Sequence, residues 1–155
     1  MRRIKGKRII VIPLVAAISL GCFGSAAQMS GTEMAVNGIK YYISNDSDNL
    51  MRFSCLLECS NGLKDEGNGK LKCVGGTVVR DGYKARTVVE LQQSTSNGWT
   101  TIKTWSGTGG SEKSFGEYYY VNDGTYRLKV THIAIDGDEV TETFISYSST
   151  VTVVI

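Results

Sequence analysis

The sequence contains almost no proline and almost no histidine. Pro13 is the single proline and His132 the single histidine among 155 residues, whereas glycine occurs 18 times. Such a chain makes its turns through positive φ angles at glycine rather than through proline rings. The closely spaced pair Cys55 and Cys59 has no second pair of metal ligands and no histidine nearby, which argues against a zinc site. We therefore expect no metal and no cofactor.

The sequence also lacks any helical stripe of useful length. Its segments are short, rich in Thr, Val, Ile and Tyr, and alternate polar and apolar residues with period two, as strands do. Strands are predicted at residues 50–59, 69–79, 84–93, 98–106, 113–121, 125–135 and 140–154. The chain also contains dipeptides that favour tight turns: Asn61-Gly62, Gly75-Gly76, Asp81-Gly82, Asn97-Gly98, Gly109-Gly110, Asp123-Gly124 and Asp136-Gly137. About seven such strands without intervening helices predict an all-β fold, an antiparallel sandwich.

A long hydrophobic run occurs only at the N-terminus. The basic segment "MRRIKGKR" precedes "IIVIPLVAAISLGCFG", and small residues at Ser25 and Ala27 predict a signal peptide, residues 1–27, cleaved between Ala27 and Gln28. Two alternatives remain: an uncleaved signal anchor, or lipidation at Cys22 within "SLGC", which loosely resembles a lipoprotein motif. All three predict a secreted or cell-surface protein, which contacts a membrane after cleavage only if Cys22 is lipidated.

Removal of residues 1–27 changes the charge balance. Five of the 17 basic residues lie there, and the remaining 12 face 15 acidic residues, which gives a net charge of −3. No cluster of Lys and Arg is evident in what remains, so a nucleic-acid partner is not expected. Residues 28–49 are interpreted as a polar lead-in in which "IKYYI" could add an edge strand, and residues 50–155 as one sandwich domain.

Three cysteines remain after cleavage, so at least one must be unpaired within the chain. A hairpin centred near Glu66 would place Cys59 opposite Cys73, and export would favour a disulfide between them. The alternative is that Cys55, Cys59 and Cys73 are all small buried thiols, which pack as apolar side chains.

The stretch "NDGTYRLKV", residues 122–130, resembles the start of strand F in immunoglobulin-like and fibronectin-III-like sandwiches. Tyr126 matches the tyrosine whose hydroxyl bonds back to the backbone at that corner, and Leu128 stands where an antibody domain has a cysteine. Further upstream, "VVELQQSTSNGWTTIKTW" is similar to the strand, turn and strand of bacterial extracellular immunoglobulin-like modules. The chain as a whole resembles small secreted sandwich proteins of Gram-positive bacteria with no assigned activity. The resemblance implies a fold and no site residues.

Catalysis is not expected. His132 lies within a predicted strand on the same face as Tyr126, Leu128 and Val130, and the sequence identifies neither a nucleophile nor an orienting carboxylate for it. Its neighbours Arg127, Lys129 and Thr131 belong to the opposite face, and so do Glu90 and Gln92 on the strand at residues 84–93.

Aromatic residues are the candidate binding groups. The period-two pattern places Trp99 and Trp105 on one face of their strand, and Tyr118 and Tyr120 on one face of the next, with Tyr119 on the other. We expect Trp105, Tyr118 and Tyr120 to be exposed for stacking on a sugar or peptide. For Trp99, burial in the core with a bulge near Thr101 is favoured over exposure.

These observations predict a binding module without enzymatic activity. Its partners would be cell-wall glycan or another extracellular polysaccharide or protein, contacted through the exposed aromatic residues. The alternative is a structural or interaction protein that associates through a free cysteine or an edge strand.

Overall fold

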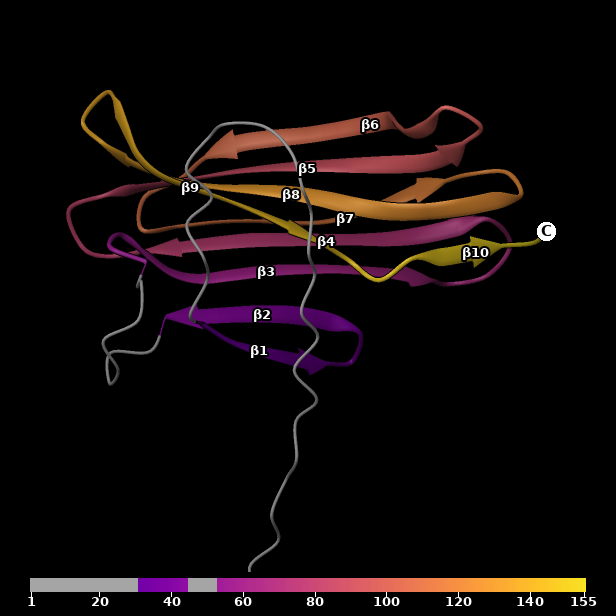
Figure 1. Ribbon diagram of the computed structural model, residues 1–155, viewed down its shortest axis with the longest axis horizontal. Coiled ribbons are helices and arrows are strands. Elements are labelled where there is room, and N and C mark those ends of the chain that lie inside the picture. Colours follow the sequence, from indigo (N-terminus) through magenta and orange to yellow (C-terminus); the bar gives the residue numbers. More distant parts are fainter. Residues whose placement is uncertain (1–30, 45–52) are drawn as a thin grey trace, which may run out of the picture.

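The computed structural model describes residues 31–44 and 53–155, and within them every regular element is a strand. The strands are β1 (Gly31–Val36), β2 (Ile39–Ser44), β3 (Leu56–Asp65), β4 (Lys70–Val79), β5 (Lys84–Thr95), β6 (Gly98–Thr108), β7 (Glu112–Tyr120), β8 (Gly124–Asp136), β9 (Glu139–Tyr147) and β10 (Val151–Val153). They form two antiparallel five-stranded sheets, one in the order β1-β2-β3-β4-β7 and the other in the order β10-β8-β5-β6 with β9 also paired to β8 (Figure 1). The predicted all-β architecture of two antiparallel sheets is confirmed. No helix within the described residues could cross a membrane.

Five of the predicted strands coincide with β4 to β8 to within a few residues, because their turns are the predicted ones. The first predicted strand, residues 50–59, has the wrong bounds: it overlaps β3 at residues 56–59, and residues 50–52 lie outside the described part of the chain. β3 continues to Asp65, and the dipeptide Asn61-Gly62, predicted as a turn, lies inside it. Gly75-Gly76 is likewise inside β4. The last predicted strand divides into β9 and β10.

Part of the predicted lead-in is a hairpin. β1 and β2 pair through a turn at Asn37 and Gly38, whose φ angles of 52° and 78° fit a two-residue hairpin turn. β2 then pairs with β3, so the hairpin extends the first sheet. The expectation of a strand from "IKYYI" is confirmed, but its position at the edge is wrong, because β1 forms the edge.

A bulge interrupts β6. Leu91 of β5 pairs with Lys103, but the next residue, Gln92, pairs with Thr101, so Ile102 is the extra residue. An inserted residue reverses the alternation of side chains. The predicted bulge near Thr101 is therefore confirmed, and Ile102 packs against the core.

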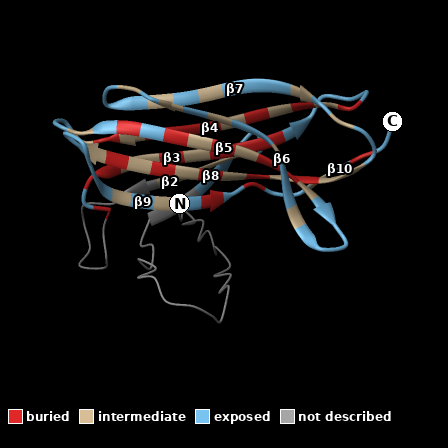
Figure 2. Ribbon diagram, turned by 90° about the horizontal axis from the view of Figure 1, so that it is seen from above, coloured by how far each residue is buried: buried red, intermediate tan, exposed pale blue. Residues whose placement is uncertain are grey.

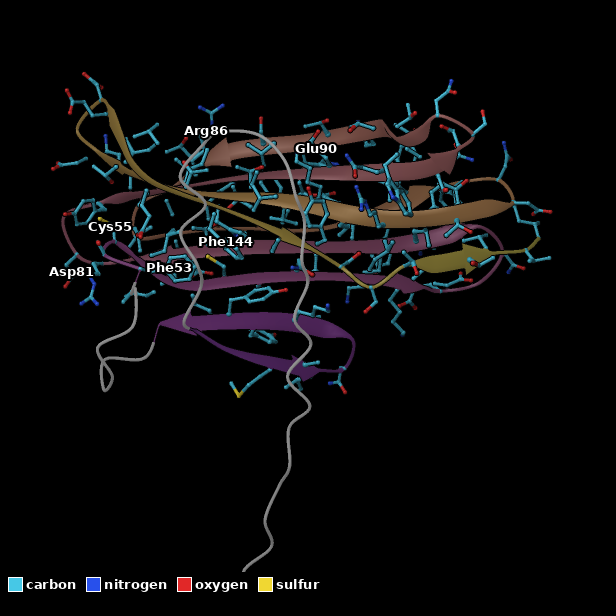
Figure 3. The ribbon with its side chains drawn as sticks, viewed as in Figure 1. Phe53, Cys55, Asp81, Arg86, Glu90 and Phe144 are labelled. Carbon is cyan, nitrogen blue, oxygen red and sulfur yellow. The ribbon has the colours of Figure 1, made fainter. Side chains whose placement is uncertain are left out.

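The buried residues lie between the sheets, mostly on the central strands β3, β4, β5 and β8 (Figure 2). They form two apolar clusters. The larger includes Leu71, Val89 and Leu128. The smaller lies at the end of the sheets where Phe53, Cys55 and Phe144 come together (Figure 3).

A layer of buried polar side chains separates the two apolar clusters. On β3, β4, β5 and β8 one residue lies between a member of one cluster and a member of the other, as His132 lies between Val130 and Ala134 on β8. On β9, Ser146 lies two residues after Phe144 of the smaller cluster. The five layer residues are Asn61, Thr77, Thr87, His132 and Ser146. Because they come from both sheets, their hydrogen bonds connect the two halves of the sandwich.

Tyr126 occupies the corner that leads into β8. Its side chain is buried, and its hydroxyl donates a hydrogen bond of 2.8 Å to the carbonyl of Asn122. The backward bond that was expected of this tyrosine is therefore present.

Candidate functional site

The outer face of the second sheet carries an ordered cluster of aromatic and charged side chains. On β5 and β8 the outward residues alternate with those of the core, and Gln92 pairs directly with Arg127 while Glu90 pairs with Lys129. β6 adds Trp99 opposite Ser94, on the same face. We call this surface the Arg127 platform; its members are Glu90, Gln92, Trp99, Thr101, Arg127, Lys129 and Tyr147.

Arg127 is held between two aromatic rings. The carbon of its guanidinium lies 4.2 Å from the ring centre of Trp99 and 4.5 Å from that of Tyr147. Trp99 comes from β6 and Tyr147 from β9, so the stack spans the width of the sheet. A cation over an aromatic face contributes about 0.5 to 1 kcal/mol at exposed sites and more where water is excluded. The stack therefore limits the orientations open to the arginine.

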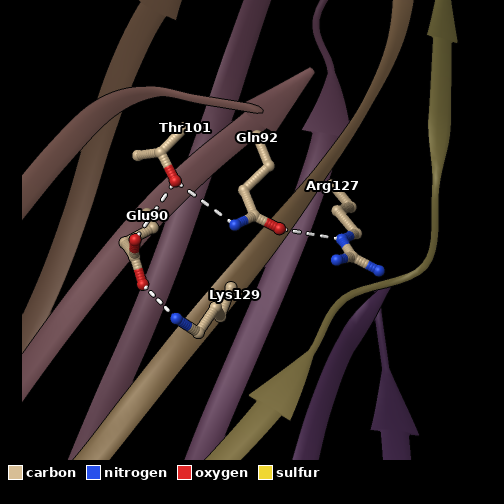
Figure 4. Close-up of polar contacts among 5 residues, drawn as sticks. All are labelled: Glu90, Gln92, Thr101, Arg127 and Lys129. Atoms are coloured by element: carbon tan, nitrogen blue, oxygen red, sulfur yellow. Dashed lines mark hydrogen bonds and ion pairs between the residues drawn. The ribbon is translucent and has the colours of Figure 1, made fainter. Parts of the chain in front are cut away.

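A chain of polar contacts leads away from the stack (Figure 4). Arg127 Nε donates to Gln92 Oε1 at 2.9 Å, and Gln92 Nε2 donates to Thr101 Oγ1 at 3.2 Å. Thr101 in turn donates to Glu90 Oε1 at 3.1 Å, and Lys129 Nζ lies 2.9 Å from Glu90 Oε2. Both ends of the chain are cations. The contacts hold hydrogen-bonding groups at fixed positions on an open sheet face.

Trp105 and Trp99 lie on opposite faces of β6 because the bulge at Ile102 lies between them, but the faces are the reverse of those predicted. Trp105 pairs with the buried Val89 and packs against the larger cluster, with its ring 6.1 Å from that of Tyr119 and nearly perpendicular to it. Trp99, expected in the core, lies on the outer platform. The expected roles of the two tryptophans are therefore exchanged.

Tyr118 and Tyr120 are exposed, as predicted, with exposed fractions of 50% and 70%. Tyr119 points the other way and packs on the core. β7 belongs to the first sheet, so these two tyrosines do not share a surface with Trp99. The four candidate aromatics thus divide among three places instead of forming one site.

His132 has partners that the sequence did not identify. Its Nδ1 lies 2.9 Å from Thr77 Oγ1, its Nε2 lies 2.8 Å from Ser146 Oγ, and its ring stacks on Phe144. Burial lowers the pKa of His132 from 6.5 to about 3, against the smaller opposing effect of a backbone hydrogen bond at Gly76. The imidazole is therefore neutral at physiological pH.

The hydrogen bonds continue on both sides of His132. Asn61 Nδ2 donates to Ser146 Oγ at 2.7 Å. On the other side, Thr87 Oγ1 lies 2.7 Å from both Thr77 Oγ1 and the carbonyl oxygen of Lys113. Although Ser146 and His132 have the spacing of a nucleophile and its base, both are buried, so a substrate could not reach them. The arrangement suits a structural role.

The three cysteines of the described chain are free and buried. Cys59 pairs with Thr77 and Cys73 with Leu63, so the predicted Cys59–Cys73 disulfide is wrong. The reason is the hairpin register, which is centred on Asn68 and not near Glu66. Burial raises the pKa of Cys73 to about 12 and that of Cys59 well above its usual 9.0.

The predicted signal peptide, its cleavage position at Ala27 and Gln28, and Cys22 lie outside the described residues. Of the platform residues, the sequence pattern correctly placed Glu90, Gln92, Arg127 and Lys129 on outward faces. It did not indicate which of them would meet across strands, and it gave no sign of the contact between Arg127 and Tyr147.

Comparisons of the chain with protein-family models, with curated proteins and with solved structures returned no match in any of the three.

Proposed function

We propose that this chain is a secreted, non-catalytic binding module of the immunoglobulin-like or fibronectin-III-like type. The strand order supports this type: β3-β4-β7 corresponds to strands A, B and E, and β5-β8-β9 to strands C, F and G, with β6 as an additional strand beside C. The hydrogen bond from Tyr126 to Asn122 corresponds to the tyrosine corner of these folds. Secretion by a signal peptide and a bacterial origin are part of the same proposal.

The proposed ligand is an extracellular polysaccharide such as a cell-wall glycan, bound at the Arg127 platform. The observation that carries the proposal is the clamped guanidinium. Gln92 takes one of the five N–H donors of Arg127, which leaves up to four for the hydroxyl groups of a sugar. Because the two rings already hold the arginine, a ligand does not have to order it on binding.

The aromatic residues of the platform supply the apolar part of the site. Tyr147 remains 42% exposed beside Arg127, so part of its ring is open to a sugar face. A flat sheet surface with rings and fixed polar groups suits an extended sugar chain better than a small molecule, which prefers a concave pocket.

The test uses purified residues 28–155 and a panel of insoluble glycans that includes peptidoglycan. We expect retention on at least one of them. Arg127→Lys keeps the charge but loses the planar fork, and it should weaken binding at least tenfold, as should Trp99→Ala. Arg86→Lys, the same change at an exposed arginine outside both proposed surfaces, is the matched control. The proposal fails if no glycan retains the protein, or if Arg127→Lys and Arg86→Lys bind equally well.

The second candidate is association with another protein chain through an edge strand. β1 ends the first sheet, and Met34 and Val36 on it are exposed. Association through a cysteine has less support, because Cys55, Cys59 and Cys73 are all buried. Sedimentation of residues 28–155 distinguishes the two candidates: a dimer that Val36→Lys disrupts would favour association, and a monomer at all concentrations would exclude it.

A further inference from the structure

The outer face of the first sheet carries a second cluster, on the other side of the sandwich from the Arg127 platform. The turn of the β1–β2 hairpin, the end of β3 and the middle of β4 enclose an open groove of about 590 Å³. Its charged side chains are Lys64, Glu66 and Lys72. The sequence showed no basic cluster here, because the lysines come together only when β3 and β4 pair.

The lysines of this groove repel one another. Lys64 and Lys72 lie directly opposite in the β3–β4 pair, where like charges destabilise a sheet. Lys70 lies two residues along β4, on the same face. Within the described chain only Lys64 of the three pairs with a carboxylate, that of Glu66 at 2.9 Å. The three lysines and one glutamate of this cluster have a net charge of +2, whereas residues 28–155 as a whole have a net charge of −3.

Two exposed aromatic residues border the lysines. Tyr118 pairs with Lys72 and Tyr120 with Lys70 across β4 and β7. The ammonium of Lys70 lies 4.2 Å from the ring centre of Tyr118. Both rings are at least half exposed, so the face offers cations and sugar-sized apolar surfaces side by side.

We propose that the face formed by Lys64, Lys70, Lys72, Tyr118 and Tyr120 is a second binding surface and that it takes an acidic polysaccharide. Acidic groups of the polymer lie between Lys64 and Lys72 and relieve their repulsion, while sugar rings contact Tyr118 and Tyr120. The positive charge of the groove complements the negative charge of such a polymer, and this holds whatever ligand the Arg127 platform binds. The two surfaces lie on different sheets, so each can be occupied without the other.

A nucleic acid fits these observations less well. The patch contains three lysines and no arginine, whereas a long nucleic acid would also extend along the remaining, net negative surface of residues 28–155. A polyuronate carries one charge per sugar, whereas duplex DNA carries about one charge per 1.7 Å of its axis. Single-stranded DNA is therefore included in the test as a competing ligand.

Affinity electrophoresis of residues 28–155 tests the proposal, with polygalacturonate, dextran sulfate, neutral dextran or oligo(dT) in the gel. We expect the acidic polysaccharides to retard the wild type at low salt and 0.5 M salt to abolish the effect. Lys64→Gln/Lys72→Gln should weaken binding at least tenfold. The control Lys84→Gln/Lys103→Gln makes the same charge change at two exposed lysines elsewhere and should change binding less than twofold.

The thermal stability of the double variants separates binding from folding. Removing the repulsion between Lys64 and Lys72 should leave the melting temperature unchanged or raise it. Equal binding by the two double variants, no retardation by either acidic polysaccharide, or stronger retardation by oligo(dT) would overturn the proposal. Trp99→Ala should bind the acidic polymers as the wild type does, so failure of the platform proposal would leave this result intact.

Discussion

Acid should destabilise this protein through a single side chain. His132 is buried in the middle of the polar layer, hydrogen-bonded to Thr77 and Ser146 and stacked on Phe144. None of these groups carries a negative charge that could balance an imidazolium. Burial accordingly lowers the pKa of His132 to about 3, while the unfolded chain keeps the ordinary value of 6.5.

The difference between the two pKa values sets the sign and the size of the effect. Between pH 6.5 and pH 3 the unfolded chain binds a proton at His132 that the folded chain does not, so the free energy of unfolding falls as the pH falls. The slope approaches about 1.4 kcal/mol per pH unit once the unfolded histidine is mostly protonated, and the loss between pH 6.5 and 4.5 amounts to about 2.3 kcal/mol. Such a loss is a large part of the stability of a typical domain, about 5 to 15 kcal/mol.

Urea titrations of residues 28–155 at several pH values measure this effect. His132→Gln cannot take up the proton, so its stability should fall less steeply than that of the wild type, by about 1.4 kcal/mol per pH unit in this range. Ser146→Ala is the matched control: it leaves the imidazole nitrogen without a partner and costs about 1 to 3 kcal/mol at neutral pH, but it keeps the steep slope. Parallel slopes for wild type and His132→Gln would refute the reasoning.

Two further predictions concern close packing and the thiols. Gly75→Ala should lower the free energy of unfolding in urea by about 1 to 3 kcal/mol, because the added Cβ would lie 2.6 Å from a methyl group of Val89. Gly116→Ala, where the added Cβ meets nothing within 4 Å, should be neutral or slightly stabilising. Equal effects of the two substitutions would contradict this packing. Cys59 and Cys73 should resist a thiol reagent at pH 8 until the chain is unfolded, since burial raises the pKa of both thiols. An intact mass of the purified protein about 2 Da below the value for free thiols would instead indicate a disulfide.

The parts of the fold that the sequence predicted are those with local causes. Alternation and the turns at Asp81-Gly82, Asn97-Gly98 and Asp136-Gly137 give the positions of β4 to β8, because a glycine with positive φ needs no tertiary contact to define a turn. The same rule failed at Asn61-Gly62. There Asn61 is kept in a strand by its bond to Ser146, 85 residues away, and no local pattern can indicate such a partner.

The candidate site was less predictable, because it depends on register. Outward faces for Arg127 and Glu90 follow from alternation, but the contacts among strands β6, β5, β8 and β9 do not. The favoured prediction of a bulge near Thr101 is confirmed, but the tryptophan that it turns toward the core is Trp105 and not Trp99. A single inserted residue decides which tryptophan faces the core, and only the pairing with β5 locates it.

The polar layer in the core and the Arg127 platform on the surface depend on the same register. In a strand, a slip of one residue moves every side chain to the other face. The bonds of Thr87 and His132 within the layer hold β5 and β8 in the pairing that also sets Gln92 beside Arg127. A slip of two residues keeps the apolar face inward, and an apolar core of similar volume would tolerate that slip more easily, because hydrophobic contacts have no direction. The buried hydrogen bonds thus do more than link polar side chains across the core: they favour the register in which the surface residues of the platform meet.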